Sequence, residues 1–202
     1  LIDRADPTRF FLSGASLLAA ASPDNPRSRF GGPEFATFSG VNETLQSVPK
    51  TFTLSSRRGD HLVFEHQPTN ILITLVCLKN DGNYCTHGDG RYTRWYKRFE
   101  VASQPLKLGS FPAPGNVDRY LDERFGQWRT PPFFYDPVLD APNTVIDRSL
   151  EGLLFVYSKM RGTFATGRRH YADEWAIIMR DQFGIEYSNF VPHGVPRKVL
   201  AT

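Results

Sequence analysis

The sequence lacks features that mark several classes of protein. Two cysteines among 202 residues are too few for a disulfide-rich scaffold. No stretch approaches the roughly 20 apolar residues of a membrane-spanning helix, so we predict no membrane span. Residues 10–22 form a short apolar run that favours a short helix or packed arm over the remnant of an organellar presequence. Because the first residue is not Met, we expect a processed chain or a fragment, and the compartment stays open.

Recognised catalytic motifs and a strong charge of one sign are missing as well. The sequence has no G-x-S-x-G, no Walker sequence and no G-x-G-x-x-G after a predicted strand. A serine hydrolase, a P-loop nucleotidase and a dinucleotide-dependent enzyme are therefore disfavoured, and we expect no cofactor. The 24 basic and 21 acidic residues leave a net charge of +3, which is too mild to indicate nucleic-acid binding by itself.

Proline, glycine and aromatic residues are plentiful. The 15 prolines and 16 glycines are spread along the chain, which indicates many turns and short elements and favours β architecture. Aromatic residues make up 13% of the sequence and include 16 phenylalanines, which indicates large packed or contact surfaces.

The chain is organised around residues 70–101. Residues 70–79 contain the longest apolar run, rich in β-branched residues, and predict a buried strand. Asp81-Gly82 then gives a strong hairpin signal, and residues 92–101 predict a further strand. With residues 51–55 and 61–66 this makes four short strands joined by turns, as in an antiparallel meander or sandwich.

The remaining segments predict fewer strands. Residues 1–50 are expected to form an N-terminal arm, because the prolines between 22 and 50 exclude a central strand. Apolar spacing and end signals predict two helices, 116–125 with Asn116 as its N-cap and 170–183 closed by Gly184. We also predict loops over 102–115 and 127–143, and strands over 153–159 and 185–190.

These segments predict a mainly β fold for residues 51–202, a single domain preceded by the arm. The expected architecture is an antiparallel sandwich or jelly-roll-like pair of sheets, with two helices and proline-rich arms. The alternative is an α+β fold with the C-terminal helix packed on a sheet, which the strand–helix–strand order from 153 to 190 supports.

Cys77 and Cys85 flank the predicted hairpin. With a three-residue loop they face each other and a disulfide becomes geometrically allowed; with a two-residue loop Cys77 faces Thr86 instead. The spacing of the cysteines and His87 matches no standard zinc pattern, so we predict no metal site. Two buried or near-surface free thiols are the simplest interpretation.

Two groups of residues are candidates for chemistry. His61 and Glu65 share one face of the predicted strand 61–66, while Asp60 and His66 share the other; such a pair can do acid–base work. Basic residues form the second group: they precede the C-terminal helix or lie within strand 92–101, with aromatic residues among them, as suits phosphate or nucleic-acid contact. They are Arg161, Arg168, Arg169, Arg94, Lys97 and Arg98.

Taken together, the sequence favours a non-enzymatic structural subunit of a larger assembly, such as a capsid-like shell or an organellar complex, with nucleic-acid contact. Protein partners in a homo- or hetero-oligomer are expected. The main alternative is an enzyme acting on a phosphorylated or nucleic-acid substrate through His61, Glu65 or His87. A secreted domain with a Cys77–Cys85 disulfide is a third hypothesis.

Overall fold

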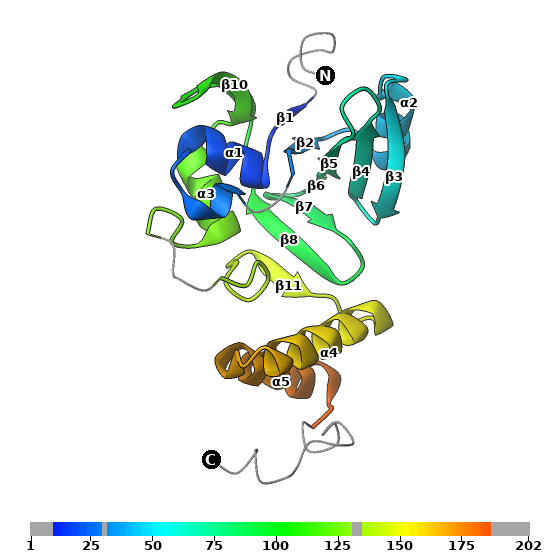
Figure 1. Cartoon of the computed structure of the whole chain (residues 1–202), viewed down its shortest axis with the longest axis vertical. Coiled ribbons are helices and arrows are strands. Elements are labelled where there is room, and N and C mark those ends of the chain that lie inside the picture. The colour runs from blue at the N-terminus through cyan, green and yellow to red at the C-terminus, as the bar shows by residue number, and fades with distance from the viewer. Residues whose placement is uncertain (1–9, 30–31, 131–134, 187–202) are drawn as a thin grey trace. The chain divides into compact units, whose positions relative to one another are not determined.

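The computed structural model describes residues 10–29, 32–130 and 135–186, and the chain divides into two compact units, Leu1–Val145 and Ile146–Thr202 (Figure 1). The fold is α+β, with 34% helix and 33% strand. The expected mainly β sandwich or jelly roll is therefore wrong. Two misassigned segments account for much of the difference: the supposed arm contributes helices, and a supposed strand near residue 155 is helical.

A mixed five-stranded sheet forms one part of the first unit. Its strands, in spatial order, are β1 (Phe11–Leu12), β2 (Glu34–Thr37), β5 (Ile71–Cys77), β4 (His61–His66) and β3 (Phe52–Arg58). The predicted strands near 51–55, 61–66 and 70–79 are confirmed as β3, β4 and β5, which pair antiparallel in that sequence. β2 pairs parallel to β5 although the prolines around it predict an arm.

Helices cover both faces of this sheet. α2 (Val41–Ser47) lies over β3 and β4 (Figure 1), where Leu45 packs with the buried Leu62 and Phe64. α1 (Gly14–Ala21), followed by the short 3₁₀ helix η1 (Pro26–Arg29), contributes buried leucines to the core on the other face. Residues 10–47 thus belong largely to the folded unit.

A second sheet continues directly from β5. Its order is β11 (Thr144–Ile146), β8 (Tyr92–Lys97), β7 (Tyr84–Gly88) and β6 (Lys79–Asp81). The predicted hairpin is confirmed, but its loop is Gly82–Asn83, so Cys85 faces Asn80. Cys77 remains in β5 of the first sheet, and neither register that the sequence suggested is adopted.

Residues 102–115 form a hairpin of β9 (Val101–Leu106) and β10 (Gly109–Pro114), so the predicted loop is wrong. Its prolines, Pro105, Pro112 and Pro114, lie in a two-stranded ribbon. Each strand there has one unpaired edge, where a residue without an N–H group is tolerated.

The predicted helix at 116–125 is confirmed as α3 (Val117–Phe125). The Asn116 side chain accepts a hydrogen bond from the Arg119 N–H at 3.0 Å, which is an N-cap. Tyr120, Leu121 and Phe125 are buried along one stripe of the helix.

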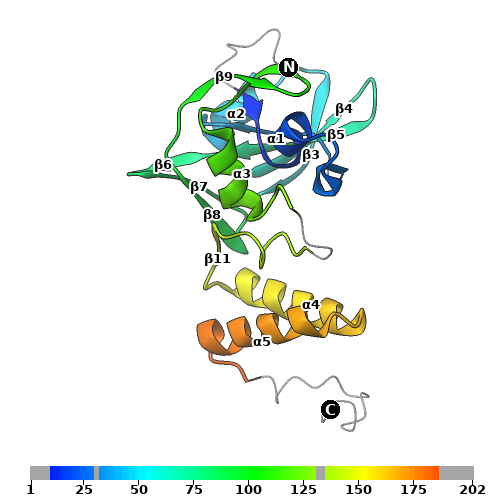
Figure 2. The same ribbon diagram turned by 90° about the vertical axis from the view of Figure 1, so that its left-hand side faces the viewer.

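The second unit contains two helices that run side by side (Figures 1 and 2): α4 (Leu150–Ala165) and α5 (Arg169–Phe183). The helix predicted at 170–183 is confirmed and ends at Gly184 in the left-handed conformation. The strand predicted over 153–159 is wrong. Ser149 caps the Gly152 N–H at 3.0 Å, and burial at 152, 156, 160 and 163 follows a helical period.

The C-terminal end of the described chain contains no strand. Ile185 and Glu186 are not in a strand, and residues 187–190 of that predicted strand lie outside the described residues. Within the described part of the chain, no helix has both the length and the hydropathy that crossing a bilayer requires.

Candidate functional site

Strand alternation gives the β6–β7–β8 sheet two chemically different faces. Directly opposed residues of an antiparallel pair lie on the same face, so the pairs Thr86–Trp95 and Tyr84–Lys97 share one side. We call this the outer face; its residues are Lys79, Asp81, Tyr84, Thr86, Trp95 and Lys97. The opposite, inner face consists of Cys85, His87, Arg94 and Tyr96.

Two aromatic side chains are exposed on the outer face. Tyr84 is 46% exposed and Trp95 is 38% exposed. Their ring centroids are 6.1 Å apart with an interplanar angle of 83°, so the edge of one ring meets the face of the other. Lys97 is opposite Tyr84, and Lys79 is in the same cross-strand row as Trp95. The outer face therefore combines aromatic surface with positive charge, although Asp81 lies opposite Tyr84.

The structure separates the basic residues that the sequence suggested as nucleic-acid contacts. Lys97 and Arg98 are exposed at the end of β8. Arg94 points to the inner face, is 2% exposed, and its Nη2 donates to the Pro137 carbonyl at 2.7 Å. In the second unit, Arg161, Arg168 and Arg169 are exposed near the turn between α4 and α5.

A pair of histidines lies on the inner side. Nε2 of His61 and Nδ1 of His87 are 2.7 Å apart, within hydrogen-bond distance. The His87 ring, 3% exposed, stacks on Tyr96 with centroids 5.8 Å apart, and Tyr96 stacks on Tyr120 at 4.5 Å. The structure thus brings together two of the three residues suggested for acid–base work. Glu65 lies four residues from His61 along β4, about 13 Å away at the rise of a strand.

Hydrogen bonds extend from the stacked rings to β2. The Tyr120 hydroxyl and the Ser13 hydroxyl are 2.8 Å apart, and Ser13 Oγ donates to Glu34 Oε1 at 3.1 Å. Arg124 forms an ion pair with Glu34 at 3.5 Å. Because these groups come from β2, α3 and the start of α1, the network ties together elements that are distant in sequence.

Burial shifts the pKa values of the inner-face groups. Burial lowers the pKa of His61, although the carboxylates of Glu34 and Asp89 act in the opposite direction. The pKa of His87 lies well below its ordinary value, because the ring is buried and because a positive charge on His61, Arg94 or Lys79 opposes its protonation. Burial also raises the pKa of Tyr96 to about 12. At neutral pH these groups are uncharged.

The β3–β4 turn packs on the end of β7 beside the histidine pair. The Asp60 N–H donates to the Gly88 carbonyl at 2.8 Å, and Asp60 Oδ2 accepts from the Gly88 N–H at 3.0 Å. Lys79 Nζ pairs with Asp60 Oδ1 at 2.6 Å. Gly59 has φ +54°, and a Cβ there would lie 2.4 Å from the Gly88 carbonyl oxygen. Only glycine fits this turn without displacement.

The two cysteines are not bonded to each other, and neither has the exposed, low-pKa thiol that is typical of a reactive cysteine. Both are free and buried, so the candidate disulfide is not formed. Cys77 Sγ contacts Thr44 Oγ1 at 3.6 Å, Cys85 Sγ contacts Asn80 Oδ1 at 3.5 Å, and burial raises the pKa of each thiol. Among the described residues, no group of three or more His, Cys, Asp or Glu side chains is arranged to hold a metal ion.

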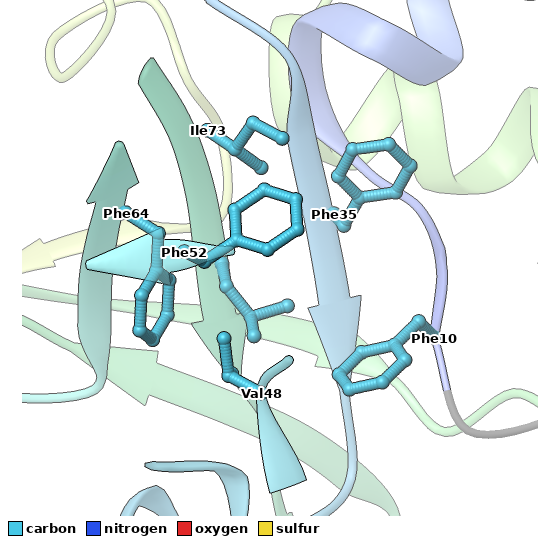
Figure 3. A pocket seen from close by; sticks show the side chains of 7 residues that line it. Phe10, Phe35, Val48, Phe52, Phe64 and Ile73 are labelled. Carbon is cyan, nitrogen blue, oxygen red and sulfur yellow. The ribbon is translucent and has the colours of Figure 1, made fainter. Parts of the chain in front are cut away.

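An apolar cavity lies between the five-stranded sheet and the segment around α2 (Figure 3). Its volume is about 20 Å³, close to the space that one water molecule occupies. The lining is entirely apolar: Phe10, Phe35, Val48, Phe52, Phe64, Ile73 and Leu75. A cavity of this size without polar groups is a packing gap of the core rather than a ligand site.

Sequence reasoning missed several residues of the inner face. Alternation in β8 separates Arg94 and Tyr96 from Trp95 and Lys97, and this signal was available in the sequence. The contact between His61 and His87 had no local signal, because it depends on how two sheets meet. Compared with known proteins, the chain matches no family model and no curated sequence.

Proposed function

We propose that this chain is a non-enzymatic subunit of a larger assembly and that it contacts nucleic acid through the outer face. The observation that supports this proposal is the exposed Tyr84–Trp95 pair with Lys79 and Lys97 beside it. Exposed apolar side chains that lie together on a surface, as these two rings do, are a common feature of interaction sites. Bases stack on such rings, and Lys97 supplies charge for the phosphates, whereas the charge of Lys79 is already paired with Asp60.

The charge distribution favours contact with nucleic acid through one small patch rather than through the whole surface. The net charge of +3 gives the chain no strong overall attraction for a polyanion. Lys97 and Arg98 are adjacent at the end of β8, close to the aromatic pair. Base stacking therefore contributes a large share of the proposed affinity, and phosphate contacts add a smaller share that depends on salt.

Exposed apolar side chains support the assembly part of the proposal. Leu108 lies exposed at the turn of the β9–β10 hairpin, and Leu150 and Leu154 lie exposed one turn apart on α4. Apolar side chains that neighbour one another on a surface are a common feature of protein contact sites. Light scattering with absorbance at 260 and 280 nm tests this part. A defined oligomer is expected, and a monodisperse monomer would contradict it.

Nucleic-acid contact is tested by fluorescence anisotropy with a labelled 20-nucleotide oligouridine. The wild-type chain is expected to bind, and Trp95→Ala to weaken binding by about tenfold, because stacking is worth about 1–3 kcal/mol per base. Trp95→Phe keeps an aromatic face and is expected to retain most of the affinity. Leu54→Ala, 41% exposed on β3 of the other sheet, is the matched control. Equal binding by wild type and Trp95→Ala would exclude the outer face.

A second candidate function has one specific observation in its favour. The 2.7 Å contact between His61 and His87 is the geometry of an acid–base pair, as an enzyme acting on a phosphorylated or nucleic-acid substrate would need. His61 is partly exposed and His87 is buried, so His61 is the member that a substrate would reach. Loss of a phosphodiesterase or phosphatase activity in His61→Ala would favour this candidate.

A further inference from the structure

The histidine pair lies where the two large sheets of the first unit meet. We call this place the sheet junction; it consists of Gly59–His61 from the β3–β4 turn and His87–Asp89 from the end of β7. The His61–His87 contact is 2.7 Å long, and Asp60 adds a hydrogen bond in each direction with Gly88. The junction is therefore held by the histidine contact and by the Asp60–Gly88 hydrogen bonds, one of which uses the Asp60 carboxylate that also pairs with Lys79.

A hydrogen bond between two imidazole rings requires one nitrogen that carries a proton and one that does not. A neutral pair meets this condition, and so does a pair with one added proton. When both rings are protonated, all four nitrogens are donors and the two rings carry like charges. Full protonation therefore breaks the contact.

The surrounding charges determine the order of protonation. The groups that face the pair are Glu34 from β2, Asp60 from the β3–β4 turn, Lys79 from β6, Asp89 after β7, and Arg94 and Tyr96 from β8. Burial opposes protonation of both rings. Carboxylates favour a positive charge on His61, although Arg94 opposes it, whereas every charge that acts on His87 is cationic. The first proton therefore goes to His61, and the second, on His87, separates the rings.

We propose that His61 and His87 form a proton-operated latch that holds the sheet junction closed at neutral pH and releases it in acid. This inference does not depend on the outer face or its ligand. Both histidines have folded-state pKa values below their ordinary value near 6.5, so the open or unfolded state takes up protons first as the pH falls. The latch is fully closed above about pH 6.5 and weakens progressively below it.

Hydrogen–deuterium exchange of the full chain at pH 7.5 and pH 5.0 tests the latch, with exchange times scaled for the intrinsic effect of pH. The reporters are the Asp60 and Gly88 amides, which are hydrogen-bonded across the junction. Their protection is expected to fall by about tenfold or more at pH 5.0, since each histidine contributes up to about tenfold per pH unit. Amides in the centre of β5 are expected to keep their protection.

His61→Gln is the informative variant, because its amide can donate to His87 but does not titrate. We expect it to lose at least half of the pH dependence on a logarithmic scale. His66→Gln is the matched control: His66 lies on the same strand and bonds Thr69 Oγ1 at 2.7 Å, but it is away from the junction. Wild-type pH dependence in His61→Gln, or an equal loss of protection throughout the unit, would overturn the latch.

A measurement on the wild-type chain needs no variant. The imidazole nitrogen shifts of His87 follow its protonation directly. Because the open state takes up protons first, we expect His87 to stay neutral in the closed chain at pH values where the junction amides already lose protection, and to titrate below that onset. If His87 titrates at or above the pH at which protection begins to fall, the latch is wrong.

Discussion

The outer and inner faces of the β7–β8 hairpin use the same two strands for opposite purposes. On the outer face, Tyr84 and Trp95 touch each other and leave much of their surface to solvent. On the inner face, Tyr96 is buried between His87 and Tyr120 and belongs to the core. The difference teaches that aromatic content alone says little about function in this chain. The side of the strand on which a ring lies decides whether it stabilises the fold or is free for a partner.

Alanine at neighbouring positions 95 and 96 gives the largest expected contrast between the faces. Tyr96→Ala removes a fully buried ring and is expected to lower the free energy of unfolding by about 3–5 kcal/mol. Trp95→Ala removes an exposed ring and is expected to lower it by less than about 1 kcal/mol. Urea unfolding followed by far-UV circular dichroism measures both. Similar losses would show that Trp95 is part of the core and would remove the distinction between the faces.

Two glycines near opposite ends of β7 extend the comparison to the backbone: Gly59 in the β3–β4 turn and Gly82 in the β6–β7 turn. Gly59→Ala is expected to destabilise the chain by about 2 kcal/mol or more, because φ is positive and the new Cβ would meet the Gly88 carbonyl. Gly82→Ala is the control: its φ is +57°, but nothing lies within 4 Å of its Cβ position. We expect about 1 kcal/mol there, from the backbone alone. Equal losses in the free energy of unfolding, measured in urea, would mean that the sheet junction can move to make room for the new Cβ at little cost.

Removal of a single tyrosine hydroxyl gives the smallest expected difference in stability between the buried network and the outer face. Tyr120→Phe removes the group that bonds Ser13 and is expected to cost about 1 kcal/mol. Tyr84→Phe removes an exposed hydroxyl on the outer face and is expected to change the free energy of unfolding by less than about 0.5 kcal/mol. If Tyr120→Phe proves neutral in the same assay, the hydrogen-bond network adds nothing to the stacking of the rings.

Local signals in the sequence predict part of this fold well. Polar–apolar alternation over residues 51–55 predicts β3, Asp81-Gly82 identifies the β6–β7 hairpin, and Asn116 marks the start of α3. Each depends on residues within one element. For the same reason the helix at 169–183, with its regular apolar stripe, is predicted within a residue.

The errors arise where tertiary context overrides composition. The run Leu153–Lys159 looks like a strand because it is apolar and contains Val and aromatic residues, yet the cap at Ser149 and the burial of Val156 and Met160 belong to a helix. The prolines between 22 and 50 predict an arm, yet Pro33 lies just before β2 and does not prevent the parallel pairing of that strand with β5.

The sequence predicts part of the outer face of the candidate site but not the histidine contact on the inner side. Lys97 and Arg98 were expected at the surface and lie there, and the alternation of β8 could have assigned Arg94 to the interior. The junction of His61 and His87 joins residues 26 positions apart on different sheets. No local pattern encodes such a contact, because it follows from the packing of the two sheets.

The placement of the three tryptophans has a practical consequence for spectroscopy. Trp175 is fully buried in α5 of the second unit, Trp128 is buried in the first unit just after α3, and Trp95 is partly exposed on β8. Trp95 is therefore more exposed to solvent than the other two indoles, which are buried in different units. Versions that keep one tryptophan at a time would let intrinsic emission follow the two units and the exposed strand surface separately, so that their unfolding transitions are resolved as independent signals.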